Sequence, residues 1–144
     1  MSGSASISGL SGSGVIRVSA VVFRDANGAV LTVRKQGAQR FMLPGGKPEP
    51  GESARQTAVR ECAEEIGVSV DADELTDLGE MRAEAANEPG CTVSAAVFTS
   101  AQVVSPVSDA EIAEVRWVDP AAPGDTALAP LLRDHIFPAL AAKG

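Results

Sequence analysis

The stretch that most constrains the fold of this 144-residue chain begins at Pro44 and ends at Gly67. Pro and Gly occupy six of its first eight positions, which predicts a loop. Ser53 and Gln56 are spaced as in a capping box, and Gly67 favours a left-handed helix cap, so we expect a helix over residues 53–66. A short helix defined at both ends fixes which of its side chains share a face.

The segments on either side of this stretch have mainly strand character. Runs rich in β-branched residues predict strands, which we expect at 15–23, 29–35, 78–85, 91–99 and 114–118. Turns are expected at 25–28 and 87–90, and Thr126 is expected to cap a final helix that ends at Leu140. Strands interleaved with two helices predict an α/β (α+β) fold, with a mixed sheet between helices.

Length and composition point to one folded domain, which we expect over residues 15–144. Residues 1–14 are rich in Gly and Ser and lack the pattern of a signal peptide, so we expect a flexible tail, either native or added. Because no apolar run approaches the length of a membrane span, we expect a cytoplasmic protein with no membrane partner. Cys62 and Cys91 lack metal-ligand spacing and are expected to be free buried thiols.

The net charge of −7 argues against a general nucleic-acid-binding role. The charge is unevenly distributed, because residues 1–60 carry eight of the twelve Lys and Arg but only three of the nineteen Asp and Glu. A basic part folded against an acidic part could hold a polyanion beside cations bound by carboxylates. An acidic surface that only aids solubility is the simpler alternative.

Three carboxylates fall on one face of the expected helix. Glu61, Glu64 and Glu65 are spaced i, i+3 and i+4 and lie within about 100° of one another, opposite an expected apolar face of Val59, Cys62, Ala63 and Ile66. Like charges at this spacing weaken a helix, so local stability does not explain the triplet. Mg²⁺ binds carboxylate oxygens and bridges to phosphates, and it would offset the repulsion. A solvated acidic face with Arg60 as partial counter-ion is the alternative.

The residues around this triplet resemble a known family motif. The pattern is the Nudix box, G-x5-E-x7-R-E-U-x-E-E-x-G-U with U an aliphatic residue, and it is matched by Gly46, Glu52, Arg60, Glu61, Glu64, Glu65, Gly67 and Val68. Cys62 takes the first U position, where a buried thiol serves as a modest hydrophobe. The lead-in LPGGK at 43–47 is also similar to the family's. The sequence is identified as a member of the Nudix hydrolases, which implies an α/β/α sandwich.

The resemblance implies metal-dependent hydrolysis of the pyrophosphate linkage in a nucleoside diphosphate joined to another group. It implies Mg²⁺, with Mn²⁺ as a substitute, held by Glu61, Glu64, Glu65 and the Gly46 carbonyl. Glu61 would be a further ligand or the general base. Arg60 would orient a catalytic carboxylate, and Glu52 would support the loop and helix.

Candidates outside the box each have a structural alternative. A general base could come from Glu111 or Glu114, with Glu84 and Glu88 behind them, although exposed Glu is common. Substrate phosphates could be bound by Lys47, Arg34 and Arg17, or these could be ordinary surface charges. Trp117 and Phe41 could stack on a base or fill the core, and His135 is expected to pack or face solvent.

Marks of particular subfamilies are mostly missing. The chain has no Tyr, which excludes the pattern of dinucleoside polyphosphate hydrolases, and Pro89 lies too far beyond Gly67 for the usual ADP-ribose pattern. We therefore expect a MutT-like hydrolase of (d)NTPs or modified nucleotides, with ADP-ribose or another nucleoside diphosphate sugar as the alternative. A non-catalytic nucleotide-binding module is a further alternative, disfavoured by the complete set of box carboxylates. The family also suggests a homodimer.

Overall fold

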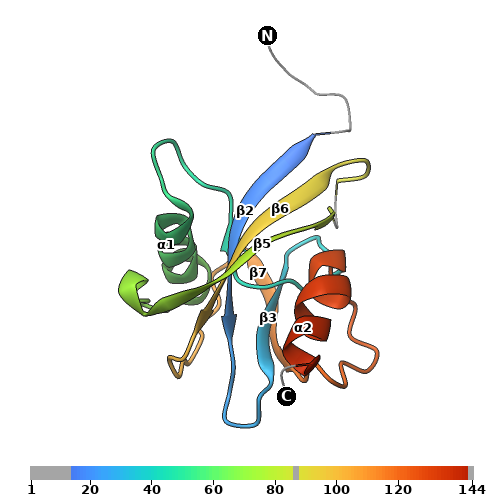
Figure 1. The fold of residues 1–144 in the computed structure, drawn as a ribbon. Helices are drawn as coiled ribbons and strands as arrows, with labels where there is room; N and C mark the ends of the chain where they lie inside the picture. The colour runs from blue at the N-terminus through green and yellow to red at the C-terminus, as the bar shows by residue number, and fades with distance from the viewer. Residues whose placement is uncertain (1–13, 86–87, 143–144) are drawn as a thin grey trace.

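The computed structural model describes residues 14–85 and 88–142, and it places helices on both sides of a layer of strands (Figure 1). In chain order the elements are β2 (Val15–Phe23), β3 (Val30–Lys35), β4 (Gly45–Gly46), α1 (Ala54–Ile66), the 3-10 turn η1 (Ala72–Glu74), β5 (Leu75–Glu84), β6 (Thr92–Ser100), β7 (Ile112–Val118), the π-helical turn η2 (Leu132–Ile136) and α2 (Phe137–Ala142). The expected α/β fold with a mixed sheet is confirmed.

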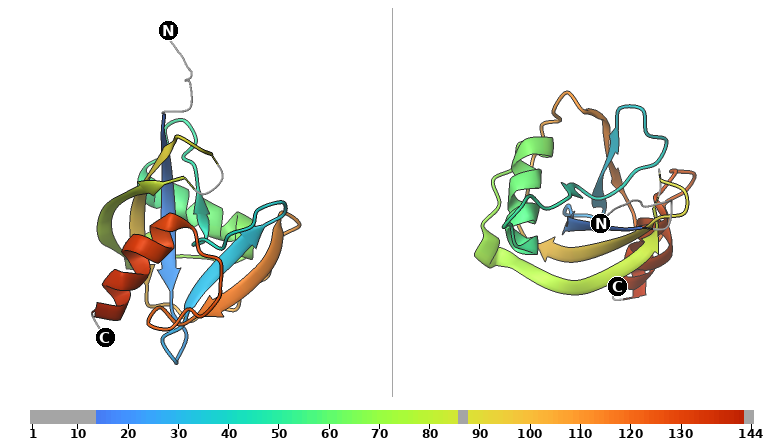
Figure 2. Two further views of the ribbon diagram at one scale, coloured as in Figure 1. Left: turned by 90° about the vertical axis from the view of Figure 1, so that its right-hand side faces the viewer. Right: turned by 90° about the horizontal axis from the view of Figure 1, so that it is seen from above.

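The strands form two sheets. The larger has the order β4-β2-β6-β5, and within it β2 and β6 run parallel while the other pairs are antiparallel. β3 and β7 form a separate antiparallel pair, visible beside β2 when the molecule is turned (Figure 2). The sequence pattern predicts the mixed sheet but not this division, because strand pairing is decided by contacts between distant segments.

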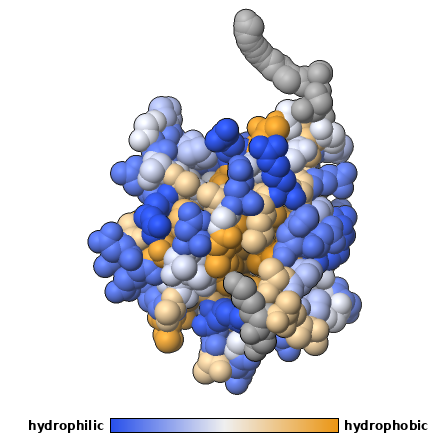
Figure 3. Space-filling model, in the orientation of Figure 1, coloured by the Kyte–Doolittle hydropathy of each residue, from blue (hydrophilic) through white to orange (hydrophobic). Residues whose placement is uncertain are grey.

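Two apolar clusters flank β2. Ala20 and Val22 belong to the cluster that includes Phe137 of α2, whereas Val21 and Phe23 belong to the cluster on the α1 side. This division follows from the two-residue period of a strand, and burial of both faces explains why β2 is apolar without interruption over residues 20–23. On the face shown in Figure 3, apolar side chains gather at the centre between hydrophilic margins.

Both ends of α1 form as the sequence predicts. The Ser53 hydroxyl accepts a hydrogen bond from the Gln56 backbone N–H at 3.1 Å, and the Gln56 side chain accepts one from the Ser53 N–H at 2.9 Å. Gly67 closes the helix in the left-handed conformation, with φ of 64°. Local signals therefore suffice to place this helix.

The C-terminal helix begins later than expected, and Thr126 is not its cap. Phe41 donates its N–H to the Ala127 carbonyl at 2.7 Å and accepts from the Ala129 N–H at 2.9 Å, which keeps this segment extended. Helical structure starts only at Pro130, whose fixed φ suits a first helical position. Leu140 lies within α2, which ends at Ala142.

Other expectations differ in detail. β5 starts at Leu75, three residues before the expected strand, and β7 starts at Ile112, two residues before the expected strand.

Cys62 is buried and free, but Cys91 is only half-buried, so the prediction of two buried thiols is wrong for Cys91. The tail at 1–14 lies outside the described residues except for Gly14, and the turn at 87–90 is described only from Glu88. No helix in the described ranges is long and apolar enough to cross a membrane.

Candidate active site

The loop containing Gly45 and Gly46 fits tightly between β2 and α1. A Cβ atom on Gly46 would lie 2.5 Å from the carboxyl carbon of Glu61, and one on Gly45 would lie 1.9 Å from the Ser19 carbonyl oxygen. A side chain at either position would collide with the neighbouring atoms. The two glycines thereby allow the backbone of this loop to lie directly against the Glu61 carboxylate.

Arg60 is the centre of an ion-pair network on α1. Its guanidinium donates to Glu52 through Nε at 2.6 Å and Nη2 at 3.0 Å, and its Nη1 donates to Glu61 at 3.0 Å and to Glu64 at 3.1 Å. Nη2 also donates to the Lys47 carbonyl oxygen at 3.0 Å. Arg60 therefore joins the glycine-rich loop to three carboxylates.

Glu52 is the strongest partner of Arg60. Hydrogen bonds from the Arg60 side chain and from the Glu49 backbone N–H lower the pKa of Glu52 from 4.5 to about 2. The Thr57 hydroxyl also donates to Glu52, at 2.8 Å. These contacts place Glu52 between the loop and the first turns of α1.

Glu65 differs from the other two carboxylates of the triplet, because it is buried, with 7% exposure. One of its oxygens accepts from the Gly45 N–H at 3.0 Å, and the other lies 3.2 Å from the Lys35 ammonium nitrogen. Burial raises the pKa of Glu65, while the Gly45 hydrogen bond and Lys35 act in the opposite direction.

The three carboxylates that share this helix face are not equally exposed. Glu64 is exposed, Glu61 is half-buried and Glu65 is buried, whereas Ala63, expected on the apolar face, is exposed. The reason is that α1 contacts the glycine-rich loop as well as the sheet, so a larger part of its circumference is covered.

A cleft of about 500 Å³ opens beside this network. Charged side chains line it near α1 and the glycine-rich loop, namely Lys35, Lys47, Glu49, Arg60 and Glu61. Most of the remaining wall is aliphatic and includes Ile16, Val18, Met42, Val93, Leu131 and Leu132. Glu84 and Glu88 also line it. The cleft thus combines ionic groups with an apolar surface, as small-molecule sites commonly do.

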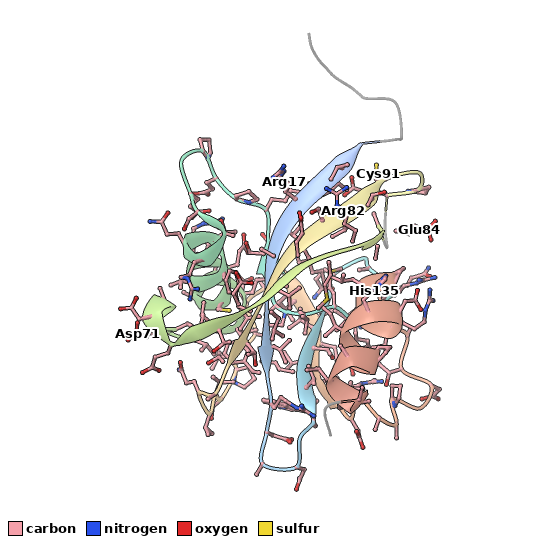
Figure 4. The ribbon with its side chains drawn as sticks, in the orientation of Figure 1. Arg17, Asp71, Arg82, Glu84, Cys91 and His135 are labelled. Atoms are coloured by element: carbon pink, nitrogen blue, oxygen red, sulfur yellow. The ribbon has the colours of Figure 1, made fainter. Side chains whose placement is uncertain are left out.

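The structure brings only some of the candidate cations to the cleft. Lys47 lines it, but Arg34 lies 3.6 Å from Glu114 and 5.9 Å from the centre of the Phe41 ring, and it is not part of the lining. Arg17 is exposed on β2 (Figure 4) and lines a separate, smaller depression. Lys35, which the sequence reasoning missed, does line the cleft, and its adjacency to Arg34 was the only available signal.

The candidate bases outside the box are also separated. Glu114 is held by hydrogen bonds from Arg116, which with Arg34 lower its pKa, and neither Glu114 nor Glu111 lines the cleft. Glu84 and Glu88, which the sequence placed second, do line it.

The aromatic candidates lie outside the lining of the cleft. Phe41 is buried beneath the Arg116 guanidinium, which is 4.7 Å from the ring centre, and Trp117 packs against the α1-side cluster. His135 is exposed on η2 (Figure 4). An apolar ligand in the cleft would therefore meet aliphatic side chains along its walls.

The oxygen-rich donor set at this site suits a hard divalent cation. Within the described ranges no three carboxylate, His or Cys side chains are already grouped as a metal site, because Arg60 and Lys35 bind the carboxylates instead. The Glu61 carboxylate nevertheless lies against Gly46, with Glu64 one turn further along α1. Carboxylate and carbonyl oxygens are the ligands that Mg²⁺ and Mn²⁺ prefer, so the residues fit the ion.

Solved structures share this fold over most of the chain. A MutT protein from Methanosarcina mazei Go1 is 24% identical, with a TM-score of 0.73 over 91% of this chain and 96% of that one. A NUDIX hydrolase from Nitrosomonas europaea is 25% identical, with a TM-score of 0.68 over 89% of this chain and 90% of that one. These likenesses confirm the fold class.

Sequence comparison identifies the family. A protein of Bacillus subtilis (strain 168), named as a candidate 8-oxo-dGTP diphosphatase, is 40% identical over 47 residues, which cover 33% of this chain and 32% of that protein. The match therefore spans about a third of that relative's length. The model of the NUDIX domain matches residues 15–140, which is most of the chain. The chain belongs to the NUDIX domain family.

Proposed function

We propose that the protein hydrolyses the pyrophosphate linkage of a nucleotide, with a (d)NTP or a modified nucleotide as first choice and bound Mg²⁺ or Mn²⁺ as cofactor. The observation that carries this proposal is the position of Glu61, Arg60 and the Gly45-Gly46 loop in the wall of a largely aliphatic cleft. Glu64 and Glu65 lie outside the lining but are joined to it, Glu64 through Arg60 and Glu65 through the Gly45 N–H and Lys35. An ionic end suits phosphates, and an aliphatic wall suits a base and sugar.

In this proposal Glu61, Glu64 and Glu65, with the Gly46 carbonyl, hold the metal. When bound, the metal polarises phosphoryl oxygens and lowers the pKa of the attacking water. Arg60 keeps the Glu61 and Glu64 carboxylates in place through its contacts of 3.0 and 3.1 Å, and Glu52 in turn orients Arg60. Lys47 supplies positive charge to the substrate phosphates from the loop.

The name of the Bacillus subtilis relative supports including oxidised dGTP among the substrates tested. A nucleoside diphosphate sugar such as ADP-ribose is the second candidate, because Glu84 and Glu88 line the cleft and could accept hydrogen bonds from sugar hydroxyls. The net charge of −7 favours a small nucleotide over a nucleic acid as partner. A homodimer remains a family-based proposal, which light scattering can test.

The decisive experiment measures hydrolysis of (d)NTPs, oxidised dGTP, ADP-ribose and UDP-glucose with Mg²⁺ or Mn²⁺ and identifies the phosphate products. Glu64→Gln should reduce kcat at least a hundredfold, because it removes a proposed metal ligand. Glu74→Gln, an equal loss of charge at an exposed site on η1, should leave the rate unchanged. Nucleotide binding without hydrolysis of any compound would favour the non-catalytic module instead.

A further inference from the structure

Lys35 is the last residue of β3 and lies on the face of that strand that meets α1. Successive side chains of a strand alternate between its two faces, so Lys35 follows Leu31 and Val33, which pack in the α1-side cluster. Arg34 lies on the opposite face, where it interacts with Glu114 of β7. Lys35 instead reaches the buried Glu65 of α1.

The ion pair between Lys35 and Glu65 is asymmetric. Their charged atoms are 3.2 Å apart, and the side chain of Lys35 is 40% exposed while that of Glu65 is 10% exposed. Among the described residues, Glu65 is the carboxylate paired with Lys35. Arg60 is paired with four carboxylates, because Glu49 lies 3.7 Å from its Nε in addition to the three that accept its hydrogen bonds. The Lys35 ammonium thus lies at the open side of a buried carboxylate and has no competing acidic partner in the described ranges.

A buried carboxylate needs a counter-charge, which Lys35 supplies here. A divalent cation bound by Glu65 would supply that charge in its place. Lys35 would then be free within the cleft, and its long flexible stem and compact ammonium suit binding to a phosphate oxygen.

We propose that Lys35 is an exchangeable counter-ion, which neutralises Glu65 in the metal-free protein and binds a substrate phosphate once a divalent cation is present. The inference rests on the proposed function, because it takes Glu65 as a metal ligand. Lys35 acts here as a positioning residue in one state and as a phosphate-binding residue in the other.

This exchange predicts that Lys35→Met raises the affinity for metal and lowers the affinity for nucleotide. Without nucleotide, the variant should bind metal several-fold more tightly, because Lys35 no longer competes for Glu65. With metal present, it should bind nucleotide about tenfold more weakly, because a charge-assisted contact is lost. If Lys35 only stabilised the structure, Lys35→Met would weaken both metal binding and nucleotide binding, or change neither.

The test uses the full chain and two binding measurements. Mn²⁺ binding is followed by electron paramagnetic resonance without nucleotide, and binding of a non-hydrolysable dGTP analogue is measured by calorimetry with saturating Mn²⁺. Lys35→Arg should stay within about threefold of wild type in the second measurement, because it retains a cation. Arg82→Met removes an equal charge from an exposed site on β5 (Figure 4), outside the cleft lining, and should change neither affinity.

Tighter Mn²⁺ binding together with weaker nucleotide binding in Lys35→Met supports the exchange. Unchanged or weaker Mn²⁺ binding overturns it, as does unchanged nucleotide binding. Melting temperatures of all variants separate these results from unfolding. Because both measurements need no turnover, a wild-type protein that hydrolyses nothing would contradict the proposed function while the exchange is still decided by the two affinities.

Discussion

The backbone N–H of Gly45 donates a hydrogen bond of 3.0 Å to the carboxylate of Glu65, so the glycine-rich loop is fastened to the last turn of α1. Its neighbour Gly46 lies against Glu61, one turn earlier on the same helix. Two successive residues of the loop therefore meet two carboxylates, which makes the loop and helix one unit at the proposed metal site.

This contact predicts different outcomes for alanine at the two glycines. A Cβ on Gly46 meets only the flexible end of Glu61, at 2.5 Å, so Gly46→Ala should fold but lose at least tenfold in kcat because the carboxylate is displaced. A Cβ on Gly45 meets the Ser19 backbone oxygen at 1.9 Å, so Gly45→Ala should lose roughly 2 kcal/mol or more of unfolding free energy. Chemical denaturation and steady-state kinetics measure both effects. Equal stability of the two variants would contradict this interpretation.

Glu52 should make stability depend on pH in the acidic range. Its pKa in the folded protein is about 2, below its ordinary value of 4.5, so its stabilisation is fully present above about pH 4.5 and is lost as the pH falls toward 2. Glu52→Gln should therefore melt at a lower temperature than wild type at pH 7, and the difference should shrink between pH 4.5 and 2. Thermal unfolding across this range checks the trend, and a difference that grows on acidification would show that another group is responsible.

The two cysteines should differ in reactivity. Cys62 is buried, and burial raises its pKa to about 12, so it should remain unmodified in the native state. Cys91 is half-buried and should be the thiol that reacts. Titration with a chromogenic disulfide should find one reactive thiol in the native protein and two after unfolding. Cys91→Ser should abolish the native reaction, and persistence of that reaction would mean that Cys62 becomes accessible.

The capping box of α1 should contribute measurably to stability. Ser53→Ala removes the acceptor of the Gln56 N–H and should cost about 1 kcal/mol of unfolding free energy. Ser69→Ala changes an exposed serine beyond the helix and should cost much less. Urea denaturation compares the two variants, and equal losses would show that the cap adds nothing to α1.

The amino-acid sequence by itself determined the features that depend on local chemistry. The limits of α1 follow from Ser53, Gln56 and Gly67, whose caps act within a few residues. The limits of β2 also follow from the sequence, because the run rich in β-branched residues matches Val15–Phe23. The spacing of the Nudix box residues likewise identifies the family without any knowledge of tertiary contacts.

Tertiary structure alone decided how deeply Glu65 is buried and which cation pairs with it. Glu65 is buried and Glu64 exposed because the Gly45 loop covers one side of α1, and helical spacing contains no information about that loop. Lys35 rather than Arg34 reaches the cleft because its face of β3 meets α1, and Thr126 lies outside the last helix because Phe41 pairs with its neighbours. Each of these outcomes depends on pairing between residues far apart in the chain, whose energies are set only when distant segments pack together.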